Sequence, residues 1–257
     1  MRLHFIVHED FEAPGAYEIW AQNNDFKITY SRVYLNEALP SSAEDIDFLI
    51  VMCGPQDPDT TLEMCPHFNS LAEQSIIRKA IEANKVVIGV CLGSQLIGQA
   101  LGANFEHSPE REIGKFPIML TEYGITNSKF SHLGKMTEVG HWHNDMPGLT
   151  PNAKIIAFSA GCPRQIVEYS KLVYGLQCHM ELTTEVVELL IQHSEAELNQ
   201  AQHYKFVNSR EELRNHNYQE MNQNLFIFLD KLKEAYSKQH KKNECKKPSQ
   251  LGFYTRL

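Results

Sequence analysis

Short apolar runs recur along the first ninety residues, and a helical pattern lies between two of them. The runs cover residues 3–8, 27–33, 47–52 and 85–90. Over 67–83, apolar side chains repeat near a 3.6-residue period, which predicts an amphipathic helix. Apolar strands that alternate with helices are typical of a mostly parallel sheet with helices on both faces. The sequence therefore predicts an α/β fold.

The pattern changes in the second half of the chain. Residues 112–179 hold four more strand-like runs with turn-rich breaks and no clear helix, which predicts a small antiparallel portion. Helical patterns return at 184–199 and at Ser209, where Glu212 three residues later predicts a capping box. From there an apolar stripe runs to Tyr236, as in a helix packed on its parent domain.

No internal repeat and no low-complexity linker interrupts the chain. A chain of 257 residues is long enough to bury one full core. We therefore expect one domain over 1–240, with a core of 1–200 and a C-terminal helical extension of 201–240. The remaining residues, 241–257, are rich in lysine and are expected to form a basic, solvent-exposed tail.

Composition and charge exclude several classes of protein. No apolar run approaches the roughly 18–20 residues that a membrane-spanning helix needs. The first apolar run meets His8, Glu9 and Asp10 at once, so we expect a strand, no secretory signal and a cytoplasmic location. Residues 1–200 carry 13 basic against 26 acidic side chains, which argues against a nucleic-acid partner. Six scattered cysteines without a CxxC pair favour neither a disulfide framework nor a zinc site.

Cys91 follows the fourth apolar run in the sequence "GVCLG", with a glycine two positions before it and another two positions after it. This spacing is typical of a strand that turns sharply into a helix and holds a nucleophile above the sheet. A helix N-terminus favours the reactive thiolate, and the amide of Leu92 is placed to bind an oxyanion. By itself, the pattern is equally compatible with an ordinary buried cysteine.

Two further segments supply partners for Cys91. In "GLQCHMELT", alternation along an extended chain puts His179 and Glu181 on the same side, so that the carboxylate can orient the imidazole. The order Cys, His, Glu then completes a catalytic triad. In "LIVMCGPQDP" a buried strand breaks at Gly54, whose amide is a candidate second oxyanion donor. The alternative for that segment is an ordinary strand-to-loop turn.

These segments, together with "EIGKFPIMLT", "GHWHNDMPGL" and "AFSAGCPRQIVEY", resemble the class I glutamine amidotransferases. They are most similar to the free-standing group related to the glutaminase domain of GMP synthase. The resemblance implies a flavodoxin-like three-layer sandwich. It implies Cys91 as the nucleophile, His179 as general base and acid, and Glu181 as its orienting carboxylate. It further implies oxyanion donors at Gly54 and Leu92, and substrate contacts at Gln95, Trp142, His143, Asn144 and Asp145.

The sequence departs from the family pattern at several positions. Cys53 stands where many relatives have a second glycine, and we expect this second thiol to be tolerated. Met180 and Cys178 are also unusual, but neither change removes a reacting group. Asn144 occupies a position that is usually glycine, and asparagine tolerates a positive φ better than most residues.

The function implied by the resemblance is hydrolysis of the side-chain amide of glutamine through a Cys91 thioester, which releases glutamate and ammonia. No GxxxxGK[ST] or GxGxxG fingerprint is present, so an ATP-dependent synthetase that uses the ammonia is expected to be a separate chain. No metal or other cofactor is implied, and a homo-oligomer is left open. One alternative is a γ-glutamyl peptide or amine hydrolase with the same triad. Another is a catalytically silent binding or regulatory module.

Overall fold

The structure is a computed structural model that describes residues 1–244. Its parallel half has the strand order β2-β1-β3-β4-β9, an order typical of flavodoxin-like folds. Strand β1 pairs in parallel with both β2 and β3, and β4 pairs in parallel with both β3 and β9. The bounds are Arg2–Val7 for β1, Lys27–Arg32 for β2, Phe48–Val51 for β3, Val86–Val90 for β4 and Val173–Leu176 for β9.

The same sheet continues beyond β9 with antiparallel pairing through β8, β7 and β5. Strand β5 also pairs with β6, antiparallel, and with the short β10, parallel. The sequence predicted this portion but not β6, because its residues mix aromatic, imidazole and carboxylate side chains without clear alternation. The bounds are Glu106–Leu120 for β5, Met136–Met146 for β6, Lys154–Ser159 for β7, Ile166–Ser170 for β8 and Phe206–Val207 for β10.

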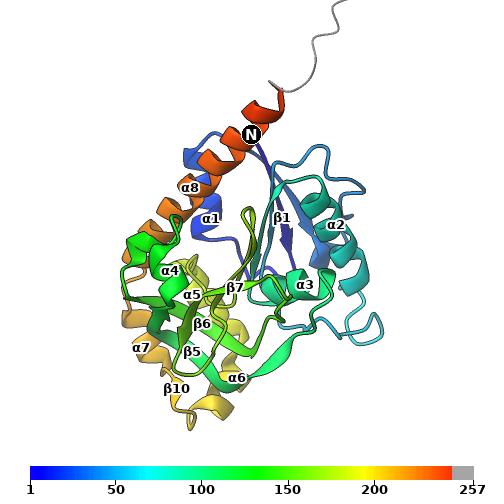
Figure 1. Cartoon of the computed structure of the whole chain (residues 1–257). Helices are drawn as coiled ribbons and strands as arrows, with labels where there is room; N and C mark the ends of the chain where they lie inside the picture. Colours follow the sequence, from blue (N-terminus) through cyan, green and yellow to red (C-terminus); the bar gives the residue numbers. More distant parts are fainter. Residues whose placement is uncertain (245–257) are drawn as a thin grey trace, which may run out of the picture.

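Helices cover both faces of the parallel half (Figure 1). On one face, α1 (Ala16–Asn23) and α8 (Gln219–Glu244) pack over the cluster that contains Phe5 and Phe48. On the other face, α2 (Ser70–Glu82) and α3 (Leu92–Ala100) pack over the cluster that contains Leu49. Successive strand residues point to opposite faces, so each apolar strand contributes to both clusters. The predicted three-layer α/β sandwich with a C-terminal helix is confirmed.

The helix predicted over 67–83 is α2, which Asn69 caps by accepting a hydrogen bond from the amide of Ala72 at 3.0 Å. The helix predicted over 184–199 is two helices, α5 (Thr184–His193) and α6 (Glu195–Ala201), which meet at Ser194. A short helix, α4 (Glu122–Thr126), two 3-10 turns (Val33–Leu35 and Ser131–Leu133) and α7 (Arg210–Asn215) complete the list of helical elements in the described residues.

The prediction of one helix from Ser209 to Tyr236 is wrong, although the capping box with Glu212 is present. The helix that starts there is α7 (Arg210–Asn215). It stops because the next residue, His216, has an extended backbone with ψ of 142°. The side chain of Asn217 then accepts a hydrogen bond from the amide of Gln219, and α8 begins. A local side-chain bond of this kind competes with helix continuation, and the apolar period does not reveal it.

Helix α8 carries the apolar stripe into the core. Met221 belongs to a separate buried cluster, and five further buried residues share one cluster with Phe48 and Trp20: Leu225, Phe228, Leu229, Leu232 and Tyr236. The helix ends at Glu244, and residues 245–257 of the predicted tail lie outside the described residues. Within the described part of the chain, no helix combines the length and apolarity needed to cross a membrane.

Truncation of Phe228 tests how much this packing stabilises the fold. Its ring stacks on Phe130 at 4.5 Å between centroids and meets Tyr174 edge-on at 5.3 Å. We expect Phe228→Ala to lower the free energy of unfolding by about 3–5 kcal/mol, measured by urea denaturation. The control is Ile227→Ala, which removes a side chain that is 41% exposed and is expected to cost about 0.5 kcal/mol or less.

Candidate active site

Cys91 lies at the junction of β4 and α3 with φ of 50° and ψ of −106°, a conformation that is strained for any residue with a Cβ. The flanking glycines make this turn possible. A Cβ on Gly89 would lie 2.2 Å from the carbonyl oxygen of Gly93, and one on Gly93 would lie 2.0 Å from that of Val51. The amide of Cys91 donates to the carbonyl of Leu176 at 2.8 Å, which ties the turn to β9.

His179 and Glu181 lie beside this turn on the segment that follows β9. Nδ1 of His179 is 2.6 Å from Oε1 of Glu181, and both side chains are almost completely buried. Burial works against a charged imidazole, but the Glu181 carboxylate and the nearby Cys53 sulfur raise the pKa of His179 well above its usual value. Nε2 of His179 has no hydrogen-bond partner among the described residues, and a ring nitrogen of His179 lies within 4.8 Å of the Cys91 sulfur. The three predicted triad residues are therefore together.

Two tertiary contacts hold the backbone around Glu181. The amide of Ala16 donates to the carbonyl of Glu181 at 2.9 Å, and a Cβ on Gly15 would lie 2.4 Å from the same oxygen. From α8, Nδ2 of Asn222 donates to the carbonyls of Met180 and Leu182 at 2.8 and 3.0 Å. The first and last helices thus fix the segment that carries the carboxylate.

The two predicted oxyanion donors belong to the segments that follow β3 and β4. Leu92 is the first residue of α3, so its amide has no partner within the helix. Gly54 follows the end of β3, where a Cβ would lie 2.4 Å from the side-chain oxygen of Gln56 and 2.9 Å from Cβ of His8. Neither amide donates a backbone hydrogen bond among residues 1–244.

Cys53 has a more central position than the sequence predicted. In the parallel pairing of β3 and β4, Val51 lies opposite Gly89, so the register continues to Cys53 beside Cys91. The Cys53 sulfur lies within 4.8 Å of both the Cys91 sulfur and a ring nitrogen of His179. Burial raises the pKa of its thiol well above the usual value. All five cysteines in the described residues are free thiols.

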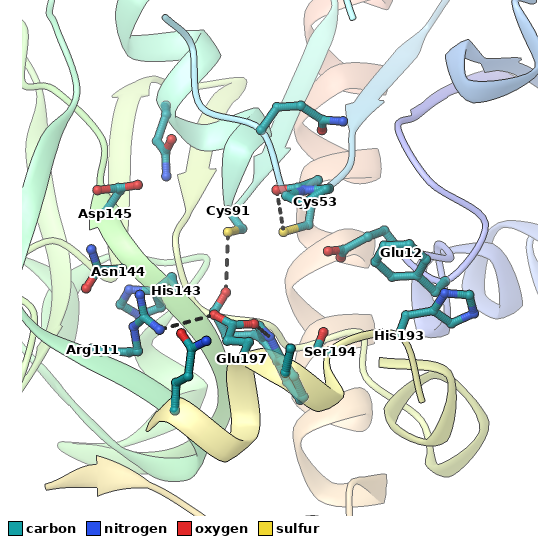
Figure 2. Close-up of a pocket in the computed structure, with 18 residues that line it drawn as sticks. Glu12, Cys53, Cys91, Arg111, His143, Asn144, Asp145, His193, Ser194 and Glu197 are labelled. Carbon is teal, nitrogen blue, oxygen red and sulfur yellow. Dashed lines mark hydrogen bonds and ion pairs between the residues drawn. The ribbon is translucent and has the colours of Figure 1, made fainter. Parts of the chain in front are cut away.

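A cavity of about 620 Å³ opens in front of Cys91. Figure 2 shows Cys91 and Cys53 at its centre, Asn144 and Asp145 on one side, and Glu12 on the other. All five predicted substrate contacts line this cavity: Gln95, Trp142, His143, Asn144 and Asp145. The last four lie on strand β6, and Asn144 does not have a positive φ.

The predicted substrate contacts differ in what they can offer to a ligand. Oε1 of Gln95 is buried without a partner among residues 1–244, so it is available to accept a hydrogen bond. The Trp142 carbonyl is 3.7 Å from the Cys91 sulfur, whereas its indole nitrogen donates to Glu197 at 3.1 Å. Nε2 of His143 lies 3.3 Å from Glu112, and Asp145 lies 2.6 Å from Nδ1 of His107. His143 and Asp145 thus already have protein partners.

Sequence reasoning missed three charged residues that line the cavity. Arg111 comes from β5 and forms an ion pair of 3.5 Å with Glu197 of α6. Glu12 comes from the β1–α1 loop, and burial raises its pKa to about 7 although His179 opposes the shift. One signal for Glu12 was available, because loops after parallel strands meet at one edge of a sheet.

The structure places a cysteine beside a His–Glu pair at the carboxyl edge of a flavodoxin-like sheet, an arrangement typical of cysteine-dependent hydrolases. Residues 10–192 match the family Glutamine amidotransferase class-I. The chain belongs to this family of enzymes, as its sequence motifs indicated.

Three relatives illustrate the relationship. The chain is 56% identical to the glutamine amidotransferase-like protein YfeJ of Salmonella typhimurium over 92% of this chain and 99% of that protein. It is 32% identical to GMP synthase [glutamine-hydrolyzing] of Lachnospira eligens over 41% of this chain and 20% of that one. The crystal structure of SMU.1228c is 45% identical and superposes with a TM-score of 0.89 over 91% of this chain and all of that one.

The raised pKa of Glu12 makes stability depend on pH. The folded state holds the Glu12 proton to about pH 7, whereas the unfolded state releases it near 4.5. Stability from this group is therefore fully present below about pH 4.5 and is lost as pH rises through about 7. Glutamine does not titrate, so we expect Glu12→Gln to remove this pH-dependent loss of stability. At pH 8 the free energy of unfolding of the variant should exceed that of wild type by up to about 3 kcal/mol.

Urea denaturation at pH 5 and pH 8 measures the difference. The matched control is Glu63→Gln, a substitution of an exposed carboxylate. Equal pH dependence of wild type and the Glu12 variant would contradict the prediction.

Proposed function

We propose that this enzyme hydrolyses the side-chain amide of glutamine to glutamate and ammonia. The observation that carries the proposal is that Cys91, which lines the cavity, meets the buried pair of His179 and Glu181, although Cys91 and His179 are far apart in the chain. The proposed site consists of these three residues, the amides of Gly54 and Leu92, and the contacts from Gln95 and β6.

In the proposed reaction, the Cys91 sulfur attacks the amide carbon and the carbonyl electrons move to oxygen. The amides of Gly54 and Leu92 donate to that oxyanion, and the loss of one such donor costs about 3 kcal/mol of barrier. His179 donates its proton to the leaving nitrogen, so ammonia departs and a thioester remains. The imidazole then takes a proton from water, which attacks the thioester and releases glutamate. Glu181 stabilises the imidazolium throughout.

The charges around the cavity support an amino-acid substrate. Glu12, Asp145 and Glu197 present carboxylates that suit an α-ammonium group, and Arg111 presents a guanidinium that suits an α-carboxylate. Oε1 of Gln95 can accept a hydrogen bond from the substrate amide or ammonium group. We propose that these groups orient the substrate above Cys91.

One observation favours a second candidate substrate. A volume of about 620 Å³ is in the range of sites for drug-sized ligands and exceeds what free glutamine needs. A γ-glutamyl peptide or amine would fill more of this space with the same reaction at the γ-carbonyl. Measuring the rates of glutamate release from glutamine and from γ-glutamyl peptides in parallel separates the two candidates.

Replacing the nucleophile tests the reaction. We expect Cys91→Ala to lower glutamate release from glutamine by roughly 10⁴-fold or more, because the loss of a single triad member abolishes most of the catalysis. Glutamate is measured by a coupled dehydrogenase assay. The control is Cys65→Ser, since Cys65 is a partly exposed free thiol that does not line the cavity. If neither glutamine nor γ-glutamyl peptides show Cys91-dependent turnover, the proposal is wrong and a silent binding module is favoured.

We further propose that the ammonia serves a separate ATP-dependent synthetase in the cytoplasm. The glutamine-hydrolysing GMP synthase supports this arrangement by analogy, because its match to this chain covers only 20% of its length and leaves the rest of that protein without a counterpart here. The five free cysteines of residues 1–244 suit a reducing compartment. Stimulation of glutamate release by a co-purified synthetase with its ATP and acceptor would support the assignment, and unchanged release would contradict it.

A further inference from the structure

A second group of buried polar side chains adjoins the cavity, and none of them exchanges a proton or forms a bond in the proposed reaction. It consists of Glu112 on β5 and His141 and His143 on β6, all at most 6% exposed. Strands β5 and β6 pair so that Glu112 lies opposite His143, and His141 lies two residues further along the same face. The sheet itself therefore brings the three side chains together.

The three side chains point one atom each at a common centre. Oε2 of Glu112 is 3.3 Å from Nε2 of His143 and 3.6 Å from Nδ1 of His141. The two imidazole nitrogens are 3.5 Å apart. Ligand atoms that surround a tetrahedral zinc ion at about 2.0–2.1 Å lie roughly 3.3–3.4 Å from one another. The observed separations match that spacing within a few tenths of an ångström.

The hydrogen bonds around the cluster leave lone pairs directed at this centre. Nε2 of His141 donates to the carbonyl of Phe116 at 3.3 Å, so its Nδ1 carries the lone pair. The amide nitrogen of Gln165 donates to Nε2 of His143 at 3.1 Å and to Oε2 of Glu112 at 2.6 Å. Three acceptor atoms thus face one another in a buried site, and the Gln165 amide nitrogen bonds to two of them.

Two further observations point to a ligand. Among the described residues, Oε1 of Gln165 is fully buried and has no hydrogen-bond partner, and Oε1 of Glu112 also lacks one. When a metal ion binds, a half-turn of the Gln165 amide would replace its hydrogen bonds to Glu112 and His143 with a fourth metal ligand, the amide oxygen. Next to the carboxylate, a Cβ on Gly161 would lie 2.8 Å from Cδ of Glu112, so only glycine leaves this space.

We infer that Glu112, His141 and His143 bind a divalent transition-metal ion of the zinc type, with Gln165 as the fourth ligand. Two imidazoles and oxygen donors at tetrahedral spacing suit Zn²⁺. The carbonyl of Phe116 on His141, and Ser159, which donates to Glu112 at 2.8 Å, are the outer hydrogen bonds that typically orient such ligands. His143 also lines the cavity, which gives the ion a route to the site.

The ion would have a structural role. His141 and His143 flank Trp142, whose carbonyl lies 3.7 Å from the Cys91 sulfur. An ion that binds both imidazoles would hold β6, and with it the wall of the cavity, at a constant distance from the Cys91 sulfur. No step of the proposed hydrolysis uses the ion, so its presence is testable whether or not the chain hydrolyses glutamine.

The test measures metal in the full-length chain purified without chelators. Plasma mass spectrometry is expected to find about one zinc per chain in wild type, and less than about 0.1 in His141→Gln and Glu112→Gln. The matched control is His132→Gln, which replaces a histidine outside the cluster and is expected to keep the ion. The inference would be overturned if neither wild type nor any variant contained zinc, iron, manganese or cobalt and none took up added Zn²⁺.

The group Cys53, Cys91 and His179 also offers three ligand atoms within 4.8 Å of one another, so it must be distinguished. Wild type loaded with Co²⁺ is expected to show tetrahedral d–d bands without thiolate charge-transfer absorption, and Cys53→Ser is expected to keep the ion. Thiolate absorption, or loss of the ion in Cys53→Ser alone, would assign the metal to the cysteine group and refute our site. The wild-type spectrum decides the question even if the His141 variant fails to fold.

Discussion

The strained backbone of Cys91 is the constraint on which the rest of the site depends. A φ of 50° turns the chain from β4 into α3 within one residue, and it persists because its surroundings permit no relaxation. The glycines at 89 and 93 let the turn pack against the backbone of β3, and the hydrogen bond to Leu176 holds it against β9. The sulfur is therefore presented at the carboxyl edge of the sheet.

The parallel order of the sheet explains why residues from distant parts of the chain meet there. The loops after β1, β3, β4 and β9 all leave from the same edge. They carry Glu12, Cys53 with Gly54, Cys91, and His179 with Glu181, respectively. The antiparallel half adds β6, which closes one side of the cavity with Trp142 and Asn144. The site thus forms where the two kinds of pairing adjoin.

The strands of the parallel half were predictable because burial on both faces requires continuous apolar runs, and the triad because each member lies in a distinctive local motif. Strand β6 was not predictable from periodicity, since its buried face holds imidazoles paired with Glu112. The break at Asn217 depends on one side-chain hydrogen bond that the apolar stripe hides. Glu12, Arg111 and Glu197 were missed because only the tertiary fold brings them to the cavity, and the central position of Cys53 follows from strand register.

Asn222 links the segment that carries Glu181 to the order in which the chain is synthesised. Its side chain holds the carbonyls on both sides of Glu181, and it belongs to the last helix of the described residues. A domain generally folds as a unit, and α8 supplies buried side chains to the cluster on one face of the sheet. The segment around Glu181 gains these two bonds only after residue 222 has emerged from the ribosome, so a nascent chain that stops short of this residue lacks the support of both carbonyls.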